Sequence, residues 1–304
     1  MILFSLLIIS LLTASIFRFS AFELFSDVAK KSHNFCIINL PEKSFAIAEL
    51  KALVCAESFS NLSDSQLYIS SGLIHLFVVS GAHLILIESA LMQLSKYFKI
   101  NSVFIFSVLC LYGLACGLNA PVVRCLIAFA LSSYLQSKNI FWPAHFKLLI
   151  IGALTLCFNY QWVSSLGLQM SWIAAFIVML TGHFFKNTSL LLKQGLFYLA
   201  LLPSVVFFQV PSPTVILFNI LLAPILEFIL FPLGILVWFF NFLHPVFDFL
   251  IYIFKLLIEK LEIDFQIQNQ TLPSTLVFYN WLFIFGLHAL FHIIYINQKR
   301  SEST

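Results

Sequence analysis

The chain has 304 residues, of which 61% are hydrophobic and only 10% are charged, with a net charge of +3. A soluble globular domain is typically about 45–50% apolar and about 25% charged. Because this chain cannot hide its apolar residues in a water-surrounded core, lipid must be their solvent. The small net charge indicates nothing about acidic partners.

The chain opens with the apolar run "MILFSLLIISLLTASIF". No basic residues precede it and no clean cleavage site follows, so we predict a retained membrane helix within residues 1–22 rather than a signal peptide. Residues 23–71 form the one long polar segment, which is short for an independent domain. Cys36 and Cys55 lie in it and could pair in an oxidising compartment, which the sequence leaves open. The remaining cysteines are expected to be inert packing residues.

Further apolar runs predict an all-α polytopic integral membrane protein of about 8–10 membrane helices, some broken or re-entrant. These runs are Gly72–Leu94, Ser102–Leu118, Pro121–Gln136, Phe146–Phe158, Val163–Phe185, Leu190–Val210, Pro213–Phe240 and Ser274–Ile296. For Pro213–Phe240 we expect a broken hairpin, with Pro224, Pro232 and Gly234 as break points. In Leu243–Asp264, polar residues recur every three or four positions, which predicts an amphipathic helix. It would lie in the membrane interface or pack along the bundle, and the stripe alone explains the interfacial position.

Basic residues alternate between loops. They occur at Lys96 and Lys99, Lys138 and Lys147, Lys186 and Lys193, and Lys299 and Arg300, whereas the turns "GLNAP", "NYQW" and "VPSP" have none. The positive-inside rule then places the Lys-bearing loops and the C-terminal end in the cytoplasm. Residues 23–71 fall outside, although they contain four lysines and several acids.

The run "GLIHLFVVSGAHLILIESAL" carries His75, Ser80, His83 and Glu88. Each ionisable group at membrane depth costs about 2.5–3.5 kcal/mol on insertion scales, so four polar groups in one span favour function over packing. A straight helix would turn His75 or Glu88 towards lipid. We therefore predict a break at Ser80-Gly81, as in discontinuous helices that line transport sites.

Other polar residues follow in later spans. Arg124 comes after Asn119, a predicted N-cap, and Pro121. It would either extend to the outer interface or contact an anionic substrate at the mouth of a pore. Gln169 needs a partner inside the bundle, and Ser171, Asn219 and Glu227 are further polar candidates. No zinc-protease, paired-cysteine or phosphate-loop motif is present, so no metal or other cofactor is expected.

These residues, in this order, resemble the membrane core of the ComEC-type competence proteins. The stretch "LKALVCAESFSNLSDSQLYISSGLIHLFVVSGAHL" is similar to the family's acidic turn and H-L-x-x-x-S-G-x-H motif, with Glu57, His75, Ser80, Gly81 and His83 at the motif positions. Later stretches match with Arg124, Gln169, Ser171, Asn219 and Pro224. Cys125 replaces an Ala, Leu168 replaces a Phe, and Val54-Cys55-Ala56 replaces a Gly before the acidic residue. The resemblance covers about residues 49–240.

The resemblance implies a channel, not an enzyme, that moves transforming DNA as a single strand across the bacterial inner membrane. His75, Ser80, Gly81, His83, Arg124, Gln169, Ser171 and Asn219 would line the DNA path. Glu57, Glu88, Pro224 and Glu227 would have structural roles, with Glu88 and Glu227 paired to internal donors. Larger family members carry a nucleic-acid-binding domain and a metallo-hydrolase domain. Residues 23–48 are too few for the first, and no His-x-His-x-Asp motif follows Ile296, so we do not carry over nuclease activity.

The expected organisation is a first helix (1–22), an extracytoplasmic segment (23–71), a competence-type core (72–240) and a C-terminal part (241–304). Partners would be single-stranded DNA, the lipid bilayer, and a separate DNA receptor, nuclease and cytoplasmic motor; a homo-oligomer is compatible with the sequence. Two other functions stay open: a small-solute transporter, and an intramembrane serine hydrolase using Ser80 and His83. A family member without a role in uptake is also compatible.

Cysteine labelling tests the topology. An impermeant thiol reagent added from outside should modify Cys36 or Cys55 if either is reduced and accessible. Lys186→Cys should stay unmodified, because its loop is predicted to be cytoplasmic. Modification at that position would overturn the topology.

Overall fold

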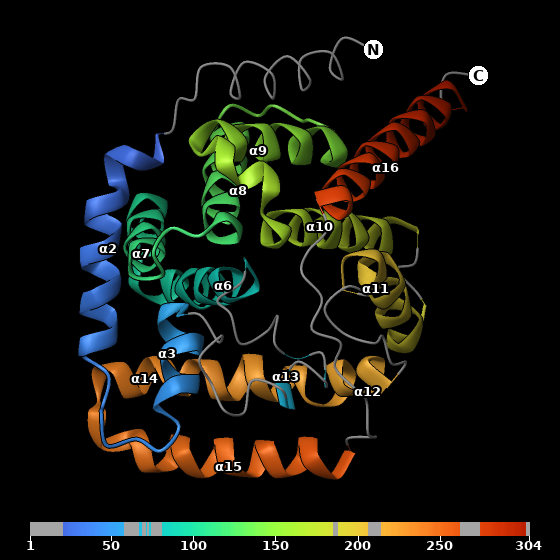
Figure 1. Cartoon of the computed structure of the whole chain (residues 1–304). Helices are drawn as coiled ribbons and strands as arrows, with labels where there is room; N and C mark the ends of the chain where they lie inside the picture. The colour runs from blue at the N-terminus through green and yellow to red at the C-terminus, as the bar shows by residue number, and fades with distance from the viewer. Residues whose placement is uncertain are drawn as a thin grey trace.

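The computed structural model describes residues 21–57, 67–68, 71, 73, 81–184, 188–205, 214–261 and 274–301. Within these residues the chain is helical and contains no β-strand (Figure 1), which confirms the all-α prediction. The predicted first membrane helix, together with His75 and Ser80, lies outside the described residues.

The described helices confirm a polytopic membrane protein. Four helical runs are long and apolar enough to cross a bilayer: Ala120–Ser137, Val215–Phe239, Asn241–Lys260 and Thr275–Asn297. Shorter apolar helices are α7 (Ser102–Ala115), α9 (Ala144–Phe158), α10 (Leu166–Phe184) and α11 (Leu190–Val205). These helices match the apolar runs of the sequence.

Buried side chains gather in three clusters. The first core contains residues from α2 (Phe22–Ile38), α3 (Ile47–Cys55), α12 (Thr214–Leu221), α14 (Phe231–Phe239) and α15 (His244–Leu261). The second core contains residues from α8 (Ala120–Ser137), α9, α10, α11 and α16 (Ser274–Ser301). A third cluster lies where α2, α6 (Gly81–Phe98), α7 and α8 meet. Since α2 and α8 each contribute to two clusters, the third one joins the two cores.

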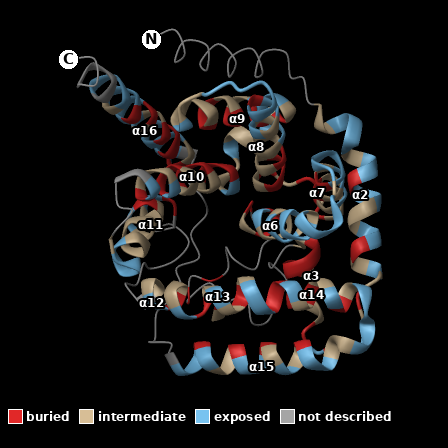
Figure 2. Ribbon diagram, turned by 180° about the vertical axis from the view of Figure 1, so that it is seen from behind, coloured by how far each residue is buried: buried red, intermediate tan, exposed pale blue. Residues whose placement is uncertain are grey.

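The polar segment 23–71 is integral to the fold. Its helix α3 is almost entirely buried (Figure 2). Cys36 and Cys55 form a disulfide that ties α2 to the end of α3, so the pairing that the sequence left open is present. Disulfides persist in oxidising compartments, which supports the predicted extracytoplasmic side for this segment.

The predicted hairpin at Pro213–Phe240 is wrong. α12, α13 (Ala223–Ile225), the π-helical segment η3 (Leu226–Leu230) and α14 follow one another along one line (Figure 1). Pro224 and Pro232 each fall in the first turn of a helical segment, where a missing N–H costs little. The wider π turn takes up the change of register between the segments.

Gly234 serves packing rather than a break. A Cβ at this position would lie 2.9 Å from Cγ2 of Val54, so only glycine lets α3 approach α14 this closely. Trp238 Nε1 also donates to the carbonyl of Cys36 at 3.0 Å, which places the end of α14 beside the disulfide. If that end lies outside, a single crossing puts the start of the run on the cytoplasmic side, opposite to the side predicted for "VPSP".

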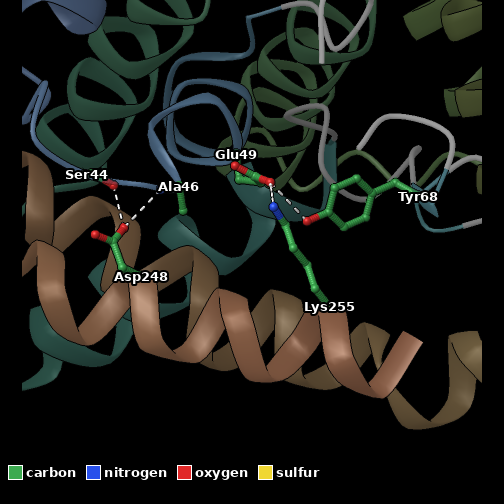
Figure 3. A network of polar contacts seen from close by, with 6 residues as sticks. All are labelled: Ser44, Ala46, Glu49, Tyr68, Asp248 and Lys255. Carbon is green, nitrogen blue, oxygen red and sulfur yellow. Dashed lines mark hydrogen bonds and ion pairs between the residues drawn. The ribbon is translucent and has the colours of Figure 1, made fainter. Parts of the chain in front are cut away.

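Helix α15 is amphipathic, as predicted, but much of its polar stripe faces protein. Asp248 accepts hydrogen bonds from the Ser44 hydroxyl and from the backbone N–H groups of Phe45 and Ala46, just before α3 begins. Lys255 forms an ion pair with Glu49, which also accepts from the Tyr68 hydroxyl at 3.3 Å (Figure 3). The helix therefore has a buried apolar face, a polar face against α3, and an exposed apolar face suited to lipid.

We expect Lys255→Met to lower the free energy of unfolding by about 3–5 kcal/mol, because it leaves the Glu49 carboxylate buried without its counter-ion. The thermal midpoint in detergent measures this loss. Lys260→Met is the matched control, since Lys260 is exposed on the same helix and has no ion pair within the described chain. Adding Glu49→Gln to Lys255→Met should restore most of the loss. Equal midpoints for Lys255→Met and Lys260→Met would contradict this assignment.

Candidate functional site

Three predicted site residues from distant parts of the sequence meet where α6, α8 and α10 pack together. The Arg124 Nε donates to the Ser171 hydroxyl at 2.9 Å, which joins α8 to α10. A Cβ at Gly81, on α6, would lie 3.8 Å from Nη2 of Arg124. We call Gly81, Arg124, Cys125 and Ser171 the Arg124 junction.

The start of α8 fixes the position of Arg124. Asn119 is the N-cap, and its side-chain oxygen accepts from the Val122 N–H at 3.1 Å, as the sequence predicted. Pro121 occupies the first turn. Arg124 is half-buried and bonded to α10, so the structure favours an inward contact over extension to the outer interface.

The guanidinium keeps unused hydrogen-bonding capacity. Arginine has five N–H donors in a planar fork. Nε is used by Ser171, and Nη2 reaches the Cys125 sulfur at a long 4.0 Å. Within the described residues no oxygen acceptor occupies the terminal nitrogens, so they are available to an anion such as a phosphate.

The model of the Competence protein family matches residues 56–299. The chain belongs to the Competence protein family. Searches of curated proteins and of solved structures gave no match.

The family match confirms the ComEC-type resemblance and widens it. It begins next to Glu57 and includes α15 and most of α16, beyond the region 49–240 in which the resemblance was seen. Membership indicates a role in competence, the uptake of DNA, which fits a protein with helices able to cross a membrane.

His83 of this Competence protein lies deeper than the Arg124 junction. Its side chain is completely buried, and its ring packs 4.2 Å from the ring of Phe231 on α14. Phe231 also contacts Tyr112 of α7, at 6.4 Å between ring centroids. The motif histidine therefore joins α6 to the first core in this conformation.

Gln169 is fully engaged inside the second core. Its Nε2 donates to the carbonyls of Val163 and Val277, and its Oε1 accepts from Asn280 of α16 at 3.0 Å. Ser204 of α11 donates in turn to Asn280 at 3.1 Å. The expected partner inside the bundle is confirmed, and Gln169 ties three helices together.

Sequence reasoning missed two partners on α16. Asn280 completes the Gln169 network, and His288 accepts from Trp172 Nε1 at 3.2 Å. Both are polar residues within an apolar run. The same pattern singled out the polar residues of Gly72–Leu91 as site candidates. Applied to Ser274–Ile296, it would have found them.

Glu57, another predicted site residue, comes directly after the left-handed turn that ends α3. Ala56 has φ 63° and ends α3, so an alanine holds the conformation that a glycine adopts more easily. The Glu57 backbone N–H donates to the Lys51 carbonyl at 3.3 Å. Ala56 therefore supplies here the left-handed turn that precedes Glu57.

The expected pairing of Glu88 and Glu227 with internal donors is not found within the described residues, where neither carboxylate has a hydrogen bond or an ion pair. Both are only partly buried. Asn219 lies on α12 and Pro224 on α13, beside the first core. No described hydrogen bond joins either residue to the Arg124 junction.

Gly81→Ala should destabilise the protein by about 1–3 kcal/mol, because the added methyl would overlap the Cys125 sulfur. Cys125→Ala should restore stability in the double variant, since the next contact, Arg124 Nη2, is 3.8 Å away. The thermal midpoint of both variants and of Cys125→Ala alone measures the coupling. Additive effects of the two substitutions would show that α6 and α8 are not in this contact.

Proposed function

We propose that this Competence protein moves transforming DNA as a single strand across the bacterial inner membrane. The observation that carries the proposal is the Arg124 junction, where a membrane-embedded guanidinium is oriented by Ser171 and retains free donors. Phosphates are the anions that a guanidinium fork binds best. Charged groups inside membrane proteins mark substrate pathways, because burying them without a role is costly.

In this mechanism the DNA strand moves past Arg124, and each phosphate of the strand in turn replaces the previous one at the guanidinium. Ser171 holds the guanidinium through Nε, which leaves the two terminal nitrogens facing the path. Gly81 provides close packing between α6 and α8, and Gln169 keeps α10 in place against α11 and α16. Translocation needs no cofactor in this chain; a cytoplasmic motor would supply the energy, and a separate receptor and nuclease would deliver the strand.

The hydrolase alternative fits the geometry less well. A general base must reach the proton that it abstracts, whereas the His83 ring is completely buried against Phe231. His83 is better suited to holding α6 against α14. Serine-reactive probes that inactivate uptake would reverse this ranking.

Arg124→Ala should reduce the arrival of labelled single strand in the cytoplasm by about tenfold or more, the scale of a lost charge-assisted hydrogen bond. Entry of duplex into the periplasm, scored separately, should be unchanged. Arg124→Lys should restore only part of the loss, because lysine cannot form a bidentate contact.

The matched serine pair separates orientation from general damage. Ser171→Ala should show a smaller loss than Arg124→Ala, whereas Ser164→Ala should behave as wild type, since the exposed Ser164 hydroxyl bonds only to the Gln161 carbonyl within its own turn. All variants must accumulate normally in the membrane. Wild-type uptake by Arg124→Ala at normal abundance would refute the proposed path.

A further inference from the structure

A second cluster of polar rings lies at the other end of α8. The ring of His145, in the first turn of α9, lies 5.8 Å from that of His292 and 5.5 Å from that of Tyr295, both on α16. His292 and Tyr295 are exposed, and Trp142, which lies just before α9, packs edge-on against Phe146 of that helix with 4.9 Å between ring centroids. We call His145, His292, Tyr295 and Trp142 the ring cluster.

Local structure places these rings side by side. α8 ends at Lys138, and Asn139 takes a left-handed conformation, φ 52°, that asparagine tolerates well. Pro143 then starts α9, which sets His145 in its first turn. On α16 the spacing of His288, His292 and Tyr295 puts all three on one face. Because His288 is held by Trp172, that face of α16 is turned towards α9 and α10.

The sequence on either side of the ring cluster is basic and free of acids. Between Glu88 and Glu227 the sequence contains seven Lys or Arg residues and no Asp or Glu, and no acid occurs between Asp264 and Glu302. The rest of the chain outside residues 89–226 has nine basic and thirteen acidic residues. Lys138 and Lys147, which flank the α8–α9 turn, therefore have no carboxylate near them in sequence.

We propose that the ring cluster, with Lys138 and Lys147, binds single-stranded DNA as it leaves the membrane on the cytoplasmic side. The inference rests on the proposed function and names a second contact for the same substrate. Single strands bind where bases stack on aromatic faces and basic groups follow the phosphates. His145, Tyr295 and Trp142 supply the faces, and the two lysines supply the charge.

The position of the cluster fits an exit. Arg124 lies in the first turns of α8 and Lys138 directly follows its last turn, about 21 Å further along at a rise of 1.5 Å per residue. Since α8 is long and apolar enough to cross the bilayer, the two sites lie at opposite ends of one crossing. The α8–α9 loop and the C-terminal end of α16 were each predicted to be cytoplasmic from their charges alone, and α9 and α16 lie next to each other (Figure 1).

Aromatic residues at a membrane interface also anchor helices in the headgroup region. An anchor needs neither two imidazole rings side by side nor flanking sequence without acids, and it has no affinity for DNA. The two roles therefore differ in a measurable property.

The test uses the full chain in phosphatidylcholine nanodiscs, which expose both faces, and a fluorescein-labelled deoxythymidine 20-mer. In fluorescence anisotropy, the double variant His292→Ala/Tyr295→Ala should bind the oligonucleotide at least about fivefold more weakly than wild type. This is the loss of affinity expected at the lower end of the range for one lost base-stacking contact. Lys138→Gln/Lys147→Gln should reduce the slope of log K against log salt by about 0.7 per lysine. Tyr279→Ala and Lys260→Gln, exposed residues elsewhere, are controls expected to bind as wild type.

Cross-linking of wild type keeps the test independent of variant folding. An oligonucleotide with 5-iododeoxyuridine should cross-link to His145, Trp142 or Tyr295 on irradiation, as mapped by peptide mass. No cross-link to any of these three residues, unchanged binding by the ring variants, or no binding by wild type would each overturn the site and leave an interfacial anchor. Arg124→Ala is tested by DNA uptake in cells, whereas the ring cluster is tested by DNA binding in nanodiscs. One proposal can therefore fail while the other holds.

Discussion

The ion pair between Glu49 and Lys255 fixes how the first part of this chain meets its last third. A carboxylate in an apolar core needs a counter-ion, and Glu49 on the buried helix α3 finds one in Lys255 of α15. With Asp248 holding the backbone before α3, the two charges position α3 against α15 and beside α14. Val54 then packs on Gly234, and α14 presents Phe231 to His83. A continuous set of contacts thus links the Cys36–Cys55 disulfide to the motif histidine.

The motif residues divide according to how much of their hydrogen-bonding capacity the fold consumes. Gln169 uses both amide hydrogens and its oxygen within the second core, so it has nothing left for a substrate. Arg124 spends one donor on Ser171 and keeps its terminal nitrogens. Both residues match the family pattern equally well in sequence. The geometry, rather than the motif, therefore makes Arg124 the better candidate for the proposed contact to an anion, whereas Gln169 holds helices together.

Periodicity and capping chemistry made the local structure predictable, whereas partners across the bundle were not. The Asn119 cap and the polar stripe of α15 were predicted because each depends on residues within a few positions. The hairpin was wrong because prolines in the first turn of a segment continue a helix as readily as they break one. The role of Glu49 could not be predicted, because its partner Lys255 is about two hundred residues away. Residue spacing predicts contacts only between neighbours on the same helix.

Charge is segregated between the two halves of the bundle. The first core carries Glu49, Asp248 and their partners, where acids serve the fold. The helices α7 to α11 contain no acid at all. A polyanion is repelled by every carboxylate it passes in a medium of low dielectric constant, and no mobile salt screens it there. A path between α8 and its neighbours α9 and α10 passes no carboxylate of these three helices, with Arg124 at one end and Lys138 at the other, whereas Glu88 lies on α6, which also packs against α8.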